Sequence, residues 1–204
     1  MMYTSIKLFF IHSCFILFLS CSKTNIDLKH DWKVYKNGDI VFRLGDSSVS
    51  NLVMIADEQS KYSHVGIIVV ENGMPMVVHA CPPDLNVISS NNKLKKDSIN
   101  VFFSFNNAVN GALYRLKDNN IAARAANEAK RLYNDGVMFD YNFDINDTTE
   151  FYCTEFIEYV YEKSGVSIIG DKHHSVIIPG IYIEDCILVS DLISSEQLEI
   201  IGSF

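Results

Sequence analysis

Positive charge is scarce in this sequence. Lysine and arginine together number 17, against 25 aspartates and glutamates, which gives a net charge of -8 over 204 residues. The one local concentration of basic side chains is Lys93, Lys95 and Lys96. Proteins that bind nucleic acid neutralise phosphates with clustered basic residues, so this composition argues against nucleic acid as a partner.

A hydrophobic run long enough to cross a membrane is also missing from the N-terminal region. Its apolar stretch covers residues 8–19, whereas a membrane-spanning helix needs about 20 apolar residues. Lys7 precedes this stretch and Ser20-Cys21 ends it, an arrangement typical of a secretory signal. Residues 1–20 are therefore predicted to be a signal peptide of the lipoprotein type.

The end of this segment, Phe18-Leu19-Ser20-Cys21, resembles a bacterial lipobox, although Phe18 replaces the usual leucine. The resemblance implies that Cys21 carries a lipid and that residues 21–33 form a polar tether. The predicted location is the bacterial cell envelope, with the lipid holding the protein to a membrane. An ordinary cleaved signal and an uncleaved anchor are the alternatives.

Close cysteine pairs of the Cys-x-x-Cys type are absent, which argues against the common zinc motifs. Of the five cysteines, Cys14 would leave with the signal and Cys21 would carry lipid. The remaining three cannot all pair within one chain, so at least one thiol stays free in an oxidising compartment. Cys153 is the predicted free thiol, and a disulfide between Cys81 and Cys186 stays open.

Internal repeats, low-complexity tracts and shifts in composition are absent as well, so one domain is predicted over residues 34–204. Turn signals and apolar periodicity predict strands over 40–42, 64–70, 76–79, 101–105 and 112–116, and helices over 47–56, 120–133 and from 153 onward. Residues 81–96 and 137–150 are predicted loops, and the apolar runs at 166–169, 176–178 and 187–189 are assigned to no element. This mixture of hairpins and helices predicts an α+β fold.

Cys153 opens an apolar-periodic stretch and is predicted to lie in the first turn of a helix, with Thr148 or Thr149 as N-cap. The positive end of a helix favours a thiolate, and His64 could complete an ion pair with it. His79 lies across the predicted hairpin from His64, where it could orient the imidazole. A zinc site using His64, His79 and either Cys153 or Cys81 is the alternative.

The sequence resembles the circularly permuted members of the NlpC/P60 papain-like superfamily, and within it the YiiX/YebB-like hydrolases. The residues that carry the resemblance are Gly38-Asp39-Ile40-Val41-Phe42, Ser63-His64-Val65-Gly66-Ile67, Gly136 to Phe143 with Phe139-Asp140, and Tyr152-Cys153-Thr154-Glu155-Phe156-Ile157. The histidine precedes the cysteine here, which is the order of the permuted branch.

This resemblance implies an antiparallel sheet packed against helices, with Cys153 as nucleophile, His64 as general base and His79 as the third polar residue. Many relatives place a glutamate where His79 stands, and a tyrosine where Phe139 stands. The residues expected to bind substrate are Tyr62, Ser63, Asp140 and Tyr152. No cofactor and no resident metal is predicted.

Three functions are compatible with these residues. The first is a monomeric thiol hydrolase that cleaves an amide of peptidoglycan stem peptides, such as a γ-D-glutamyl bond. The second is a hydrolase or acyltransferase that acts on lipids or N-acyl amines with the same triad. The third is a non-catalytic envelope module that retains the fold. Substrate specificity resides in loops whose shape the sequence does not supply.

Overall fold

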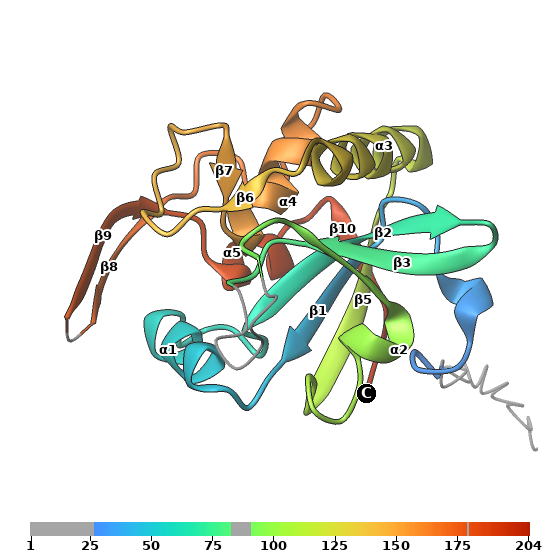
Figure 1. Ribbon diagram of the computed structural model, residues 1–204, viewed down its shortest axis with the longest axis horizontal. Coiled ribbons are helices and arrows are strands. Elements are labelled where there is room, and N and C mark those ends of the chain that lie inside the picture. The colour runs from blue at the N-terminus through green and yellow to red at the C-terminus, as the bar shows by residue number, and fades with distance from the viewer. Residues whose placement is uncertain (1–26, 83–90, 179) are drawn as a thin grey trace, which may run out of the picture.

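The computed structural model describes residues 27–82, 91–178 and 180–204, whose central feature is a six-stranded antiparallel sheet with helices on both faces (Figure 1). The strand order is β10-β5-β1-β2-β3-β4. Its strands are β1 Ile40–Leu44, β2 His64–Glu71, β3 Met74–His79, β4 Lys95–Ser98, β5 Asn110–Leu116 and β10 Leu198–Ser203. This α+β arrangement confirms the predicted fold class.

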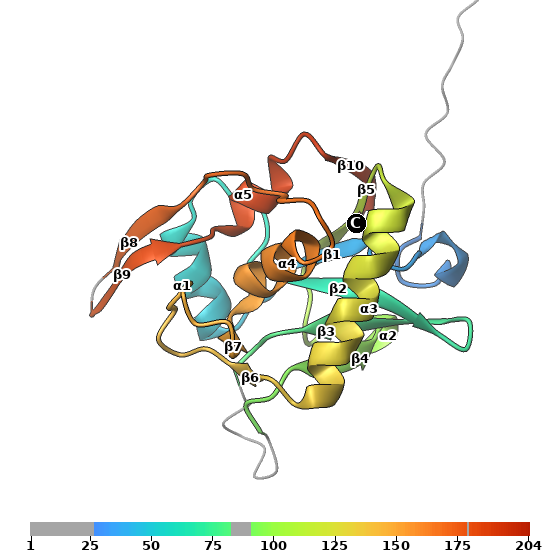
Figure 2. The ribbon, with the colours of Figure 1, turned by 90° about the horizontal axis from the view of Figure 1, so that it is seen from above.

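The remaining elements surround this sheet. The helices are α1 Ser48–Ala56, α2 Ile99–Phe102, α3 Asn119–Asp135, α4 Cys153–Glu162 and α5 Val189–Ile193, preceded by a 3₁₀ turn over Trp32–Val34. A short parallel pair, β6 Met138–Phe139 and β7 Glu150–Phe151, encloses the loop before α4. The hairpin of β8 His174–Ile178 and β9 Ile181–Cys186 projects from the body of the domain beside α1 (Figure 2).

Alternation along β2 divides the core between the two faces of the sheet. Val65, Ile67 and Val69 are buried against α3 and α4, whereas Ile68 points to the opposite face, into the cluster that contains Phe102 of α2. Each such side chain contributes about 1.5–3 kcal/mol by leaving water. Both faces of β2 are therefore fixed by packing, which holds the end of the strand where His64 lies.

The turn at Gly38 shows why a glycine stands before β1. Its φ is +79°, and a Cβ atom there would lie 2.1 Å from the carbonyl oxygen of Ala122 in α3. Asp39, the next residue, is buried and forms an ion pair of 2.7 Å with Arg115 of β5. Gly38 thus allows α3 to pack closely against the start of β1, and Asp39 links that start to β5.

The structure corrects several predictions for single elements. Residues 101–105 were expected to form a strand, but Ser98 accepts a hydrogen bond from the Val101 N–H and starts the short helix α2. The N-cap of α4 is Tyr152, not Thr148 or Thr149. Strands β4 and β10 were not predicted, because their sequences are charged or lack alternation.

The N-terminal part of the described chain is packed against the domain. Leu28 is fully buried, and its carbonyl accepts a hydrogen bond from the Tyr35 hydroxyl. The folded unit thus begins before residue 34, inside the predicted tether. The predicted signal peptide and Cys21 lie outside the described residues. Among the residues the structure describes, no helix is both long and apolar enough to cross a membrane.

Candidate active site

Cys153 is the first residue of α4, as the sequence predicts, and the backbone N–H groups of Thr154, Cys153 and Val65 lie next to its sulfur. Burial nevertheless outweighs these amides and raises the pKa of the thiol to about 11. At neutral pH this shift favours the protonated thiol over a thiolate paired with His64. The same amides are positioned to stabilise negative charge that develops nearby.

Two histidines and an aspartate form a hydrogen-bonded chain. His64 Nε2 lies 2.8 Å from His79 Nδ1, and His79 Nε2 lies 3.1 Å from Asp97 Oδ2. His79 is buried, and Asp97 is half-buried on β4, the neighbouring strand. A carboxylate thus stands at the end of the chain, so the protein contains a stronger orienting group than His79 alone.

Gly66 makes the contact between the histidines possible. Continuing the β2–β3 register places His79 opposite Gly66, so that His64 lies diagonally across the ladder from His79. A Cβ atom at Gly66 would lie 2.4 Å from Val77 Cγ1 and 3.1 Å from His79 Cβ. The missing side chain leaves room for the His64 ring to reach across the strand pair.

The surroundings of the histidines separate their pKa values. Burial lowers the pKa of His64 well below its usual value, and the positive charges of Arg43, His79 and Lys95 lower it further. Burial also acts to lower the pKa of His79, but hydrogen bonds to Asp97 and to Cys81 outweigh it and raise the pKa. His64 therefore has the lower pKa of the two rings, and it is unprotonated at neutral pH.

Phe102 forms a platform under this cluster. Its ring centroid lies 5.9 Å from that of His64 and 5.4 Å from that of His79, and the Arg43 guanidinium lies 4.4 Å above it. Arg43 also donates a hydrogen bond of 2.9 Å to the Phe102 carbonyl. Arg43 stands opposite His64 in the β1–β2 ladder, which explains its effect on that histidine.

Cys153 and His64 line the same cavity, which has a volume of about 210 Å³. Within the described parts of the chain, no hydrogen bond joins the two side chains. Apart from Cys153 and His64, the surface of this cavity is almost entirely apolar. Its other walls come from α1, from the loop before α4, and from the β8–β9 hairpin with the segment that follows, through side chains that include Leu52, Val53, Phe139, Phe143, Val176, Ile178, Ile183 and Leu188.

Hydrogen bonds at the start of α4 fix the wall of this cavity. The Tyr152 hydroxyl accepts from the Ile187 N–H at 2.9 Å, and the Thr154 hydroxyl donates to the Ile187 carbonyl at 2.7 Å. Glu155 accepts from the Tyr152 N–H at 3.2 Å. The C-terminal segment is thereby held against the residues that flank the thiol.

The four predicted substrate-binding residues divide into two groups. Ser63 and Tyr152 line the cavity, although their oxygens already accept from the Gly45 and Ile187 N–H groups. Tyr62 is buried against Phe42. Asp140 accepts hydrogen bonds from two backbone N–H groups of its own loop. Neither residue lines one of the described cavities. Tyr62 and Asp140 thus lie outside these cavities and form structural contacts, and their role in substrate binding stays a prediction.

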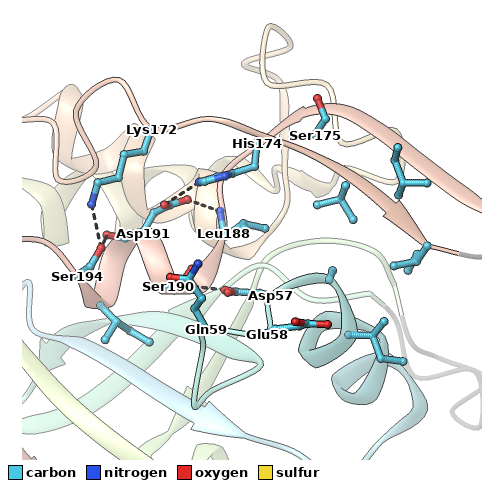
Figure 3. A pocket seen from close by; sticks show the side chains of 16 residues that line it. Asp57, Glu58, Gln59, Lys172, His174, Ser175, Leu188, Ser190, Asp191 and Ser194 are labelled. Atoms are coloured by element: carbon cyan, nitrogen blue, oxygen red, sulfur yellow. Dashed lines mark hydrogen bonds and ion pairs between the residues drawn. The ribbon is translucent and has the colours of Figure 1, made fainter.

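A second, larger cavity of about 720 Å³ adjoins the first and is lined by polar side chains (Figure 3). His174 lies 2.9 Å from Asp191, and Asp57 accepts from the Ser190 N–H. The two cavities share wall residues, among them Ala56, Val176, Ile178 and Leu188. The larger cavity contains neither Cys153 nor His64, so size alone does not mark the active site.

Comparison with known proteins identifies the architecture. The model of a family described as permuted papain-like amidase enzymes, YaeF/YiiX, C92 family, matches residues 34–185. The chain belongs to this family. It is accordingly a cysteine peptidase or amidase with a permuted papain-like fold, which confirms the predicted family and the enzyme class. Family membership also favours an enzyme over the non-catalytic module.

A solved structure shares the fold of this amidase family member. The protein described as metalloprotein yiiX from Escherichia coli O157:H7 is 20% identical, with a TM-score of 0.67, over 83% of this chain and 97% of the other. At that identity the likeness supports the fold alone. No curated protein matches the sequence.

The zinc site that the sequence leaves open does not fit this geometry. His64 Nε2 and His79 Nδ1 bond each other at 2.8 Å, closer than two nitrogens bound to one tetrahedral zinc at about 2.0–2.1 Å each, and Asp97 takes the other His79 nitrogen. Over the described ranges no group of three or more His, Cys, Asp or Glu side chains is arranged to hold a metal ion.

Proposed function

We propose that Cys153 is the nucleophile, His64 the general base, and His79 with Asp97 the orienting pair of an amidase. Its proposed substrate is an amide that joins an apolar acyl group to a polar amine. The observation that carries this proposal is the apolar cavity that Cys153 and His64 share. A ligand site of this character binds by burying apolar surface, with a few polar groups fixing orientation.

The hydrogen-bonded chain selects the tautomer that catalysis requires. Asp97 accepts a hydrogen bond from His79 Nε2–H, so the neutral His79 ring offers Nδ1 as an acceptor to His64 Nε2–H. His64 Nδ1 then carries a free lone pair. This nitrogen is the atom that takes the thiol proton of Cys153 as the sulfur attacks the substrate carbonyl.

The reaction then proceeds in two halves. The sulfur–carbon bond forms, and the oxyanion is stabilised by the N–H of Cys153, which has no partner within its helix. His64 returns the proton to the departing amine as the carbon–nitrogen bond breaks. Water, deprotonated by His64, cleaves the thioester and restores the thiol. The lowered pKa of His64 keeps it available as a base at neutral pH.

The test is a series of N-acyl amides that differ by one methylene. Each methylene buried in the cavity contributes about 0.8 kcal/mol, so kcat/KM should rise about fourfold per methylene until the cavity is filled. Val53→Phe fills part of the cavity at its α1 wall and should shorten the acyl chain that the enzyme prefers. Val101→Phe, at an exposed position on α2, should not change this preference. A kcat/KM independent of chain length would contradict the apolar acyl group.

A peptidoglycan stem peptide is the second candidate substrate, and the polar cavity supports it. Asp57, Lys172, His174 and Asp191 could hold the charged groups of a peptide or of the leaving amine. A γ-D-glutamyl amide with no acyl chain provides the comparison. Faster cleavage of this compound than of every N-acyl amide would favour the cell-wall role.

We further propose that the protein acts as a monomer at the bacterial envelope, held to a membrane by lipid on Cys21. The support is the signal-like segment and the lipobox resemblance in residues 1–21. Mass analysis of the N-terminal peptide should find acyl chains on Cys21, and Cys21→Ser should abolish them. An unmodified Cys21 would contradict the lipid anchor.

A further inference from the structure

Exposed apolar side chains gather on one face of the domain, defined here as the apolar face and formed by α1, the α2–β5 loop and the C-terminal residue. Phe105 is 92% exposed, Val109 63% and Ile55 57%. The other members are Val49, Leu52 and Phe204. Exposed apolar patches of this kind mark interaction surfaces.

Contacts show that these three segments adjoin. A Cβ atom at Gly45 would lie 2.5 Å from Ser50 Oγ of α1 and 3.5 Å from the Asn107 carbonyl of the α2–β5 loop. Gly111, where β5 leaves that loop, exchanges backbone hydrogen bonds with Phe204. In Figure 1, α1, this loop and the C-terminus all lie along the lower side of the molecule.

The side chains of the apolar face carry no charge. Residues 47–56, 99–110 and 200–204 contain no aspartate, glutamate, lysine or arginine, although 21% of the whole chain is charged. Charged side chains stand at its border: Lys29 Nζ lies 4.3 Å from the Phe204 ring, and the exposed Asp46 and Glu58 flank α1. An apolar centre with charged and polar groups at its edge is complementary to a bilayer, which offers hydrocarbon beneath a polar surface.

The N-terminal chain reaches the domain at this same face. Lys29 contacts Phe204, and Leu28 is buried in the domain. Only residues 22–27 therefore separate Leu28 from Cys21. Seven fully extended steps span about 25 Å. A lipid on Cys21, as proposed above, would therefore hold the apolar face within about 25 Å of the bilayer.

We infer that the apolar face docks on the surface of a lipid bilayer. Val49 and Leu52 belong both to this face and to the wall of the apolar cavity, so docking places the cavity beside the acyl chains of the membrane. This binding surface goes beyond the proposed reaction and does not depend on it, although its distance from the bilayer rests on the lipid anchor proposed above.

The test uses tryptophan as a positional probe in the full chain. Trp32 is replaced by phenylalanine, and one tryptophan is introduced by Leu52→Trp, Phe105→Trp or Met74→Trp, the last at the exposed tip of the β2–β3 hairpin as control. Each protein is mixed with phosphatidylcholine vesicles whose acyl chains are brominated. Emission at positions 52 and 105 should shift to shorter wavelength and be quenched, and emission at position 74 should not change.

Equal responses at all three positions, or none, would overturn the inference. A shift at positions 52 and 105 that appears without vesicles as protein concentration rises would also overturn it, since the face would then bind a second copy. Phe105→Asp separates this surface from the chemistry. Hydrolysis of a water-soluble amide should be unchanged in that variant, while hydrolysis of a vesicle-embedded amide should fall.

Discussion

Cys81 is the thiol whose pKa is lowered, although Cys153 begins the helix. Burial acts to raise the pKa of Cys81, but the hydrogen bond to His79 and the charges of His79 and Lys95 outweigh it. Burial instead raises the pKa values of Cys153 and Cys186 to about 11. All three are free thiols. The cysteine whose thiol ionises most easily, Cys81, is therefore not the proposed nucleophile, Cys153.

This difference predicts the order of alkylation. Iodoacetamide at pH 7.5 should label Cys81 before Cys153 and Cys186, because the thiolate is the reactive form. The rate at Cys153 should keep rising with pH toward 11. Peptide mass analysis over a pH series measures both rates. Rapid labelling of Cys153 that does not change between pH 6 and pH 9 would instead indicate a standing ion pair with His64.

Asp97 should matter for catalysis although it lies two hydrogen bonds from His64 Nδ1. Asp97→Asn can present an N–H to His79 Nε2. This reverses the donor and acceptor roles along the hydrogen-bonded chain and places a proton on His64 Nδ1. We expect kcat to fall by about 10²- to 10⁴-fold, a loss comparable to that in His64→Ala, because the same lone pair is no longer available as a base.

The pH profile of kcat separates this role from a loss of folding, and exposed Asp46→Asn is the matched control. An unchanged kcat and profile in Asp97→Asn would remove Asp97 from the orienting chain.

The sequence predicted Cys153, His64 and His79 because each stands in a recognisable local pattern. Asp97 and Arg43 were missed for physical reasons. Asp97 follows two lysines in a segment without apolar alternation, so β4 gave no strand signal. Arg43 stood in no recognised motif, and its role depends on the β1–β2 register, which only the paired strands reveal.

At the scale of elements, strong periodicity was predictive and short apolar runs were not. Helix α3 was expected over 120–133 and spans Asn119–Asp135, with Asp118 as its N-cap and Gly136 ending it at a φ of +75°. The run at 101–105 has four apolar residues out of five, but five residues are too few to distinguish a strand from a helical turn. The cap at Ser98 decided the outcome.

Helix α4 carries a destabilising carboxylate in its first turn. Glu155 is buried, and burial raises its pKa to about 8, while its N–H contact with Tyr152 acts against this shift. An unfolded chain ionises Glu155 near pH 4.5. The contribution of Glu155 to the free energy of unfolding therefore falls as pH rises from about 4.5 to about 8, because only the folded state resists its ionisation.

Glu155→Gln keeps an acceptor for the Tyr152 N–H and removes this ionisation. The variant should gain thermal stability relative to wild type as pH rises through that window. Exposed Glu162→Gln, at the other end of α4, is the matched control. Tm measured at pH 4.5 and pH 8.5 checks the difference, and a parallel pH dependence in the wild type and both variants would contradict the assignment.

The active-site cavity is a property of the whole molecule. Its walls come from α1, the start of β2, the loop before α4 and the β8–β9 hairpin, segments that are far apart in the sequence. No local pattern indicates that Phe139, Val176 and Leu188 share one surface. The order of histidine before cysteine could be identified from the sequence, but the apolar character of the site required the folded chain.

Formation of an acyl-enzyme on Cys153 tests the account most directly. The full chain is mixed with an activated long-chain acyl ester, quenched in acid within the first turnover, and analysed by peptide mass spectrometry. We predict one acyl group on the peptide that contains Cys153, none in Cys153→Ala, and slower formation in His64→Ala. An acyl group on Cys81 instead, or full turnover by Cys153→Ala, would contradict the proposed nucleophile.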